Sequence, residues 1–400
     1  MTTTTTTDIR ALIRAELDEL VAIRRDLHAH PELAFEEIRT SGVVQRELEA
    51  LGAGVRTHYA KGTGVVGFLP GDAERSVALR ADMDALPIVE QTGIEHASTL
   101  DGVMHACGHD GHTTILLGAA RVLSKIENRP NPVTFVFQPA EEGGGGGELM
   151  AQEGALAGED GGGIGAPARA IYGLHGWPEL DLGKVGTRAG PLLASTDDFV
   201  VTIRGVQAHA AWPHAGRDPI VCAAQVINAL QTVVSRSSNP ADAVVLTVGA
   251  IHGGTADNII PESVSFIGTI RTLDDTNRAM AERRFKEIVD GVTRSMGCRA
   301  EIDWKPGYPV TRNEAGATET FFKIADRAFG AERVERVPEA FMGGEDFSYY
   351  GEHVPACFFI LGLKPPGVRE MPQLHQPDFD FNDDAIAVGV EAMVRVALEG

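Results

Sequence analysis

The chain has 400 residues, more than a single hydrophobic core usually supports, so two domains are expected. Its 43% hydrophobic and 23% charged residues are ordinary for a globular protein, and its formal net charge of -21 argues against a nucleic acid or an anionic membrane as partner. A small anionic substrate stays compatible with this charge, because a metal site can reverse the local potential.

Residues 1–7, Met followed by six threonines, are predicted to form a disordered tail, since they lack the basic start and apolar stretch of a secretory signal. No apolar run approaches the roughly 20 residues needed to cross a bilayer. Four cysteines are too few for a disulfide framework in a chain of this length, and Cys222, Cys298 and Cys357 are predicted to be buried thiols. A reducing cytoplasm is the compartment consistent with these features.

Most of the chain alternates helical and extended patterns, which predicts an α/β domain with a mixed, largely parallel sheet. Ligands of such sheets usually bind in loops beyond the carboxyl ends of the strands. The predicted helices are 9–27, 40–51, 112–125, 319–329 and 383–398, and the predicted strands are 64–69, 76–81, 133–138 and 357–361.

A segment in the middle of the chain has a different order of elements. Strands are predicted over 198–204, 243–251, 262–272 and 298–304, and helices over 219–236 and 275–296. This β-α-β-β-α-β order is that of a ferredoxin-like α+β domain with an antiparallel sheet. The α/β domain is therefore expected to comprise residues 8–190 and 306–400, interrupted by a smaller domain of residues 191–305.

Residues 104–113 read Met-His-Ala-Cys-Gly-His-Asp-Gly-His-Thr and concentrate three histidines, a cysteine and an aspartate. Cys107 and His109 are two positions apart, so in an extended loop both side chains can face one way. A thiolate can bridge two ions, and metal binding would remove its proton. The alternative is a buried cysteine beside a helix-capping histidine. We favour metal binding, because zinc and similar ions select donors of the kinds supplied by Glu142, His175 and His375.

Glu141 and Glu142 directly follow the strand predicted over 133–138. In extended backbone the two side chains would point in opposite directions, so one is expected to bind metal and the other to accept a proton from water. The alternative is a solvated acidic turn. The glycines over 143–147 leave room for the backbone to pass close to a site, and they are a weak signal for phosphate because no Gly-Lys-Ser/Thr follows.

Six motifs occur in an order that resembles one enzyme family over nearly the whole chain. They are His-Ala-His-Pro-Glu-Leu (28–33), Arg-Ala-Asp-Met-Asp-Ala-Leu-Pro (80–87), Met-His-Ala-Cys-Gly-His-Asp-Gly-His (104–112), Gln-Pro-Ala-Glu-Glu (138–142), Ala-His-Ala-Ala-Trp-Pro-His (208–214) and Gly-Gly-Glu-Asp-Phe (343–347). The chain thus resembles the aminoacylase superfamily of metallopeptidases. Within it, the chain is most similar to the amidohydrolase branch, with hippurate hydrolase and the hydrolases of indole-acetyl amino acids.

The resemblance implies two divalent ions per subunit, Zn, Mn, Co or Ni. Cys107 would bridge them, Glu142 and His375 would complete the shell of one ion, and His109 and His175 that of the other. Glu141 would be the general base that activates a metal-bridging water.

For substrate binding, the resemblance implies that His209 polarises the scissile carbonyl, often from the partner subunit. Asn258, Arg271 and Gly344 would lie near the substrate. Asp84 is expected to orient a metal ligand without binding the metal itself. We predict structural roles for the other polar residues of these motifs, which are His28, His30, His105, His112, His214 and Asp346.

We therefore predict a metal-dependent hydrolase that cleaves N-acyl amino acids, hippurate-like or N-acetyl, into a carboxylic acid and a free amino acid. The inserted domain would serve as a lid and join a homodimer, through strand 198–203 or strand 243–248. Two alternatives stay open: a dipeptidase or carboxypeptidase with the same metals, and a catalytically silent ligand-binding protein.

Overall fold

The chain forms two units, which we call unit 1 and unit 2, in a computed structural model that describes residues 8–400. The predicted tail, residues 1–7, lies outside the described residues. Unit 1 comprises the chain up to Leu192 together with Arg312–Pro338 and Asp346–Gly400, and unit 2 comprises Leu193–Thr311 and Glu339–Glu345. No helix within residues 8–400 is long and apolar enough to cross a membrane.

The frame of unit 1 is an eight-stranded sheet, in the order β1-β2-β4-β3-β5-β16-β6-β15. Its strands are β1 (Gly54–Tyr59), β2 (Gly64–Leu69), β3 (Ser76–Asp82), β4 (Val133–Gln138), β5 (Ala168–Asp181), β6 (Val185–Thr187), β15 (Val334–Arg336) and β16 (Ala356–Lys364). The central strands β4, β3, β5 and β16 run parallel, and antiparallel pairs occur at β1–β2, β2–β4 and β16–β6. The prediction of a mixed, largely parallel sheet is confirmed.

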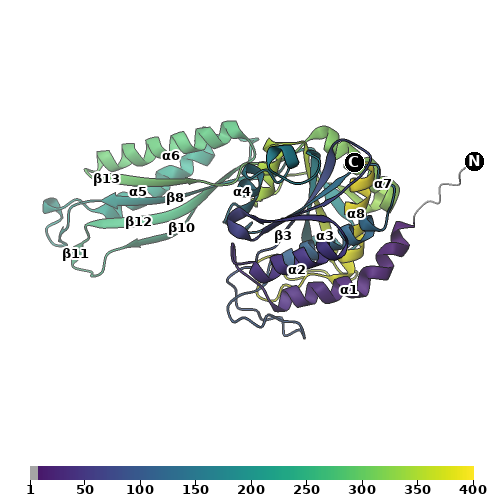
Figure 1. The fold of residues 1–400 in the computed structure, drawn as a ribbon. Coiled ribbons are helices and arrows are strands. Elements are labelled where there is room, and N and C mark those ends of the chain that lie inside the picture. Colours follow the sequence, from purple (N-terminus) through teal and green to yellow (C-terminus); the bar gives the residue numbers. More distant parts are fainter. Residues whose placement is uncertain (1–7) are drawn as a thin grey trace, which may run out of the picture. The chain divides into compact units, whose positions relative to one another are not determined.

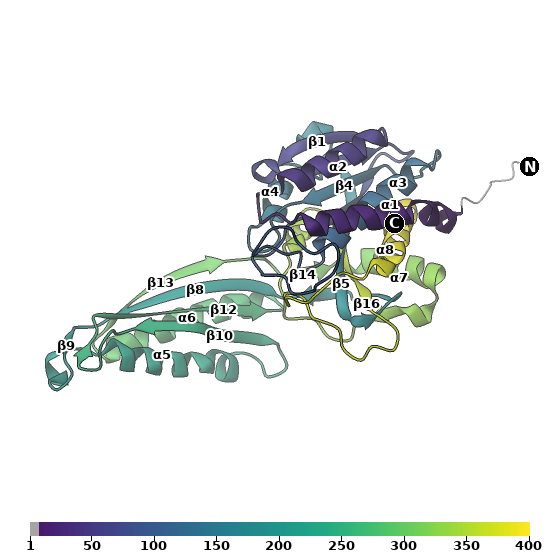
Figure 2. The same cartoon turned by 90° about the horizontal axis from the view of Figure 1, so that it is seen from below.

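Helices α1 (Ile9–Ala29), α3 (His109–Ser124) and α8 (Ile386–Glu399) pack against one another beside this sheet (Figures 1 and 2). Nearly every residue of α3 is buried, including the polar side chains of its first turns, such as His109, Asp110 and His112. At Gly118 an added Cβ would lie 2.7 Å from Val390 and 2.8 Å from Leu20, so only glycine allows this close approach of the three helices. Two more helices, α2 (Ile38–Ala50) and α7 (Ala315–Phe329), contact α3 and α8 respectively.

Unit 2 has its own antiparallel sheet in the order β10-β12-β8-β13, with two helices that pack on each other and on the sheet. The strands are β8 (Ser195–Arg204), β10 (Val244–Gly253), β12 (Ser263–Thr272) and β13 (Arg299–Pro306), and the helices are α5 (Pro219–Thr232) and α6 (Asp275–Ser295). Side chains such as Phe199, Phe266 and Phe285 fill the core between sheet and helices. The chain order is β-α-β-β-α-β.

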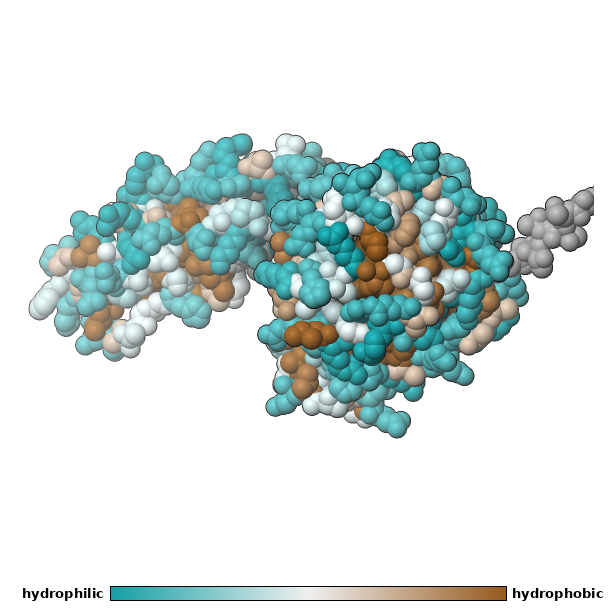
Figure 3. All heavy atoms as spheres, in the orientation of Figure 1, coloured by the Kyte–Doolittle hydropathy of each residue, from teal (hydrophilic) through white to brown (hydrophobic). Residues whose placement is uncertain are grey.

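One prediction about this sheet is wrong. Strand 198–203 was one of the two strands expected to join a homodimer, which requires a free sheet edge, but these residues lie in β8, which pairs with β12 on one side and β13 on the other. Of the two proposed edges, only β10 lies at the border of the sheet. Apolar side chains are visible on the surface of unit 2 in Figure 3, and Val245, Ile251 and Ile267 of β10 and β12 are among its exposed residues.

The chain leaves unit 1 within β7 (Gly190–Leu193) and returns to it within β14 (Thr311–Asn313), and these two strands pair. Residues 339–345, expected in the α/β domain, belong to unit 2, because Ala194 N–H donates to Gly343 O at 2.8 Å and Thr311 Oγ1 to Glu345 O at 3.0 Å. Gly344 therefore lies on unit 2.

Candidate metal centre

Cys107 and His109 come from the loop that leads into α3 and from the first residue of that helix. The sequence predicted an extended loop between these two residues, and this prediction is wrong. Gly108 has left-handed backbone (φ 86°), and the helix begins at His109 rather than at residue 112. His109 Nδ1 donates to Asp84, 2.9 Å from its backbone oxygen and 3.2 Å from Oδ1. His109 Nε2 is buried, has no hydrogen-bond partner and lies 3.7 Å from Asp82 Oδ2, so it can offer a lone pair to a metal once the ring has lost its second proton.

Glu141 and Glu142 follow β4 in a tight turn rather than in extended backbone. Their side chains therefore do not point in opposite directions, as the sequence predicted. Ala140, just before them, has a positive φ of 55°, a conformation that costs energy for a residue with a Cβ. The carboxylate of Glu37 supports this turn, because its Oε1 accepts from Ala140 N–H at 2.9 Å. Burial raises the pKa of Glu37 to about 7.

The five glycines after Glu142 give this turn its shape. Gly143 and Gly145 have positive φ values of 86° and 68°. At Gly146 an added Cβ would lie 1.7 Å from Pro139 O, and at Gly144 it would lie 2.6 Å from the Cβ of Ala140. The glycine run is thus required by backbone packing around the Glu141–Glu142 turn.

His175 lies inside strand β5, opposite Ile360 of β16, and not in a loop beyond a strand. Its Nδ1 donates to Gly176 O at 2.8 Å, and its Nε2 lies 3.4 Å from Cys107 Sγ. His375 is in a loop, with a positive φ of 66°, and its backbone N–H donates to Ala106 O at 2.8 Å. The Nε2 atom of His375 is 3.1 Å from Glu142 Oε1.

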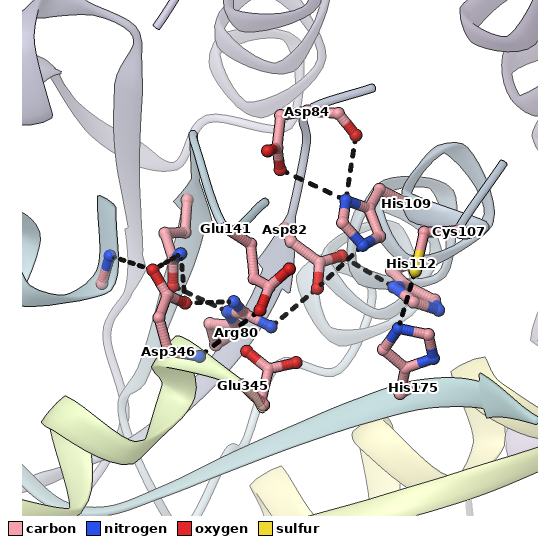
Figure 4. A network of polar contacts seen from close by, with 12 residues as sticks. Arg80, Asp82, Asp84, Cys107, His109, His112, Glu141, His175, Glu345 and Asp346 are labelled. Atoms are coloured by element: carbon pink, nitrogen blue, oxygen red, sulfur yellow. Dashed lines mark hydrogen bonds and ion pairs between the residues drawn. The ribbon is translucent and has the colours of Figure 1, made fainter. Parts of the chain in front are cut away.

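These segments bring the five expected ligands into two groups that share Cys107. In one group the donor atoms of Cys107, His109 and His175 lie within 4.8 Å of one another, and in the other those of Cys107, Glu142 and His375 do. Glu141 adds a further carboxylate within the same distance of His109 and Glu142. Figure 4 shows Cys107, His109, His175 and Glu141 around this centre. The arrangement can hold two ions with a thiolate between them.

A competing group, Asp82, His109 and His112, is less suited to a metal. Gly176 N–H donates to His112 Nε2 at 2.8 Å, so the ring proton is on Nδ1, which donates to Asp82 Oδ1 at 2.7 Å. Both ring nitrogens of His112 are therefore occupied. His105, also buried, has no hydrogen-bond partner at either ring nitrogen and belongs to none of these groups.

The electrostatics of the centre fit a cation. Burial, Glu142 and Glu141 raise the pKa of the Cys107 thiol well above its ordinary value. Burial would lower the pKa of His109, yet Asp82 and Asp84 raise it to about 10. Burial lowers the pKa of His175 to about 3, which keeps the neutral form that binds metal. The centre thus holds an excess of buried negative charge that divalent ions would balance.

The remaining expected residues lie on unit 2. His209, in the short strand β9 (Ala208–His209), pairs with Ile259 of β11 (Ile259–Ile260), and Ala210 N–H donates to Asn258 O at 2.9 Å, so His209 and Asn258 are close neighbours. Arg271 lies on β12, and burial lowers its pKa. At Gly344 an added Cβ would lie 2.2 Å from Thr196 Cγ2, so no larger residue fits.

Arg80 was not predicted to have a role in the site, although it lies in the motif of residues 80–87. Arg80 lies in β3, where all seven residues are buried, and its own side chain is 0% exposed. The signal was present, because a charged residue inside a buried strand needs charged partners nearby.

Comparison with known proteins gives consistent results. Residues 78–399 match peptidase family M20/M25/M40. The chain is 40% identical to an N-acetyl-L-cysteine deacetylase of Bacillus subtilis, over 92% of this chain and 85% of that protein. It is 39% identical to the IAA-amino acid hydrolase ILR1-like 4 of Arabidopsis thaliana, over 95% and 85%. The crystal structure of the Bacillus subtilis YXEP protein, a dinuclear metal binding peptidase from the M20 family, superposes with a TM-score of 0.81 at 32% identity, covering 96% of this chain and 98% of that one.

Proposed function

The chain belongs to peptidase family M20/M25/M40, and on that basis we propose that it hydrolyses the amide bond of N-acyl amino acids to a carboxylic acid and a free amino acid. The observation that carries this proposal is the pair of ligand groups sharing Cys107, with Glu141 beside them. Two relatives are named as an N-acetyl-L-cysteine deacetylase and an IAA-amino acid hydrolase. The protein is a metal-dependent hydrolase. Its metal can be Zn, Mn, Co or Ni, because the availability of each ion as well as the ligands decides which one binds.

We assign Cys107, His109 and His175 to one ion and Cys107, Glu142 and His375 to the other. When bound, the ions would supply Lewis acidity, lowering the pKa of water and polarising a carbonyl. Asp84 would orient both groups, because it accepts from His109 Nδ1 and, through Oδ2, from Glu142 N–H at 2.9 Å.

Glu141 is our candidate for the general base. Its carboxylate is buried and is held by the backbone N–H of Asp346, which donates to Oε1 at 3.4 Å. It would take a proton from the attacking water and return it to the amide nitrogen. An amine leaves poorly unless it is protonated, which is why one carboxylate serves twice.

His209 is our candidate for the group that stabilises the carbonyl oxygen. Its Nδ1 accepts from Ala211 N–H at 3.1 Å, so the proton of the neutral ring is on Nε2, which can donate. We place Asn258, Arg271 and Gly344 near the carboxylate end of the substrate, where Arg271 supplies the positive charge.

The β-α-β-β-α-β order of unit 2 supports a ferredoxin-like domain that acts as lid and dimer contact. We propose that the homodimer forms through β10, an edge strand with unpaired backbone groups. The four free cysteines support a reducing compartment, which we take to be the cytoplasm.

The test is an amine-release assay on N-acetyl, N-benzoyl and N-indolylacetyl amino acids, with elemental analysis of the same preparation. We expect metal-dependent release from at least one of them. Release only from free dipeptides or longer peptides would indicate a peptidase. A silent binding protein would release nothing at any metal content.

A further inference from the structure

Arg80 is a fully buried arginine that joins three segments of unit 1. Its Nε donates to Gln138 Oε1 at 2.8 Å, one terminal nitrogen donates to Asp82 Oδ2 at 2.8 Å, and the other donates to Asp346 Oδ1 at 3.0 Å. Both carboxylates are completely buried as well. Figure 4 shows Arg80 between Asp346 on one side and Asp82 and the histidines on the other, with Glu141 beside Arg80.

On one side, Asp346 connects Arg80 to the proposed general base. Its carboxylate accepts from Gln138 Nε2 at 2.7 Å and 2.9 Å, and from Gly147 N–H at 2.8 Å. Its own backbone N–H donates to Glu141 Oε1 at 3.4 Å. The contacts of the Asp346 side chain therefore fix the residue that carries this donor.

On the other side, Asp82 connects Arg80 to the ligand His175. Asp82 Oδ1 accepts from His112 Nδ1, which forces His112 Nε2 to be an acceptor for Gly176 N–H. Gly176 follows His175 directly and also accepts from its Nδ1. The chain of contacts Asp82–His112–Gly176 thus holds the backbone and the ring of a proposed ligand.

We propose that Arg80 is a positioning residue with two arms, one that places Glu141 through Asp346 and one that places His175 through Asp82 and His112. This inference rests on the proposed function, in which Glu141 is the base and His175 a ligand. A guanidinium suits this position, because its N–H donors lie in one plane and reach three acceptors in fixed directions. A lysine ammonium carries its donors on a single nitrogen and cannot span them.

The two arms predict separable effects. Asp346→Asn should lower kcat by about 10- to 100-fold and leave KM and the affinity for Co²⁺ unchanged. Asp82→Asn should weaken Co²⁺ binding to the metal-free protein by about 10- to 100-fold. Arg80→Lys, which keeps the positive charge but lacks the planar guanidinium, should show both effects.

The readouts are steady-state kcat and KM on the hydrolysed N-acyl amino acid, and titration of the metal-free protein with Co²⁺, followed by the thiolate-to-metal absorption from Cys107. Gly147→Ala offers a second route to the Asp346 arm, since its Cβ would lie 2.7 Å from Asp346 O and 3.1 Å from Oδ1. It should lower kcat without loss of Co²⁺ affinity.

Arg24→Lys is the matched control, because Arg24 is also 0% exposed and pairs with Asp110 at 2.9 Å. Its other hydrogen-bond partners are His28, His96, Asp380 and Asp383, so it lies outside the two arms of Arg80. It should lower the melting temperature and keep kcat and Co²⁺ affinity. Equal losses of kcat and Co²⁺ affinity in Asp346→Asn and Asp82→Asn would overturn the two-arm assignment. So would effects that merely follow the melting temperature in all variants. If the wild-type protein hydrolysed no N-acyl amino acid, the proposed function would fail, while the Co²⁺ titrations would still decide the Asp82 arm.

Discussion

The chemistry of single residues in the centre depends on which nitrogen of each imidazole is left free. Asp84 occupies Nδ1 of His109, and Gly176 O occupies Nδ1 of His175, so both rings turn Nε2 toward Cys107 or the neighbouring carboxylates. His112 shows the opposite case, because both of its nitrogens are taken by protein groups. Neighbouring histidines of one motif therefore have different capacities to bind metal.

The first prediction concerns the shared thiol. Cys107→Ser should lose bound metal together with kcat, because an alcohol is a poor substitute for a bridging thiolate and Cys107 belongs to both ligand groups. Elemental analysis and the release assay check this. Cys222→Ser, a buried thiol of unit 2, is the control and should keep both. Full metal content and rate in Cys107→Ser would show that the thiol does not bridge.

The second prediction separates the two glutamates. Glu141→Gln should stay folded and metal-loaded while kcat falls by about 100- to 10,000-fold, because glutamine keeps the shape but cannot accept a proton. Metal analysis and kcat are measured on the same preparation. Metal loss with residual turnover would mean that the roles of Glu141 and Glu142 are exchanged.

At the scale of the elements, the third prediction tests the turn after β4. Gly146→Ala should lower both stability and kcat, because its Cβ would meet Pro139 O at 1.7 Å and displace the Glu141–Glu142 turn. Gly291→Ala in α6 is the control: no atom lies within 4 Å of its Cβ, and alanine in a helix should stabilise by about 0.5–1 kcal/mol. The melting temperature and kcat of both variants are measured. Unchanged activity in Gly146→Ala would show that the turn tolerates a shift of its backbone.

The fourth prediction concerns the link between α1 and α3. Burial would lower the pKa of His28, but Asp110, hydrogen-bonded at 2.8 Å, and Glu90 raise it to about 9. A raised folded-state pKa contributes stability that is fully present below the unfolded value of about 6.5 and is lost as the pH rises through about 9. Protonated His28 should therefore stabilise the fold by up to about 3 kcal/mol at the lower pH.

The measurement is urea unfolding of the wild type and of His28→Gln across this range. The difference in unfolding free energy between the two proteins should be larger at about pH 6 than at about pH 10. A difference that is constant with pH would contradict the protonation of His28 in the folded state.

At the scale of the whole molecule, the fifth prediction concerns the dimer. Inactive His209→Ala subunits mixed with inactive Glu141→Gln subunits should regain activity if His209 acts on the partner's site, because one site of the heterodimer then has both groups. Activity should approach half that of the wild type per heterodimer. Subunit exchange must first be verified, and heterodimers without activity would place His209 in its own subunit or outside the reaction.

Much of this protein follows from local patterns along the chain. The helix and strand periods predicted α1, α3, β3, β4 and the four long strands and two helices of unit 2, because amphipathic spacing is a property of a few neighbouring residues. The short strands β9 and β11 were not predicted. Strand β5, which carries His175, escaped prediction, since a buried parallel strand has no alternating pattern. Strand β1 also escaped prediction, although exposed and less exposed positions alternate along it. The side chains that we propose as metal donors could also be chosen from the chain, because thiol, imidazole and carboxylate are themselves the chemical signal.

Contacts between distant segments were beyond such patterns. The inner position of β8, the contact of Gly176 with His112 and the hydrogen bonds from Arg80 to Gln138 and Asp346 each depend on residues far apart in the chain. Asp346 lies 266 positions after Arg80, and no periodicity connects them. Only packing in three dimensions chooses which buried donor meets which acceptor, because each buried polar group must find a partner among whatever the fold places beside it.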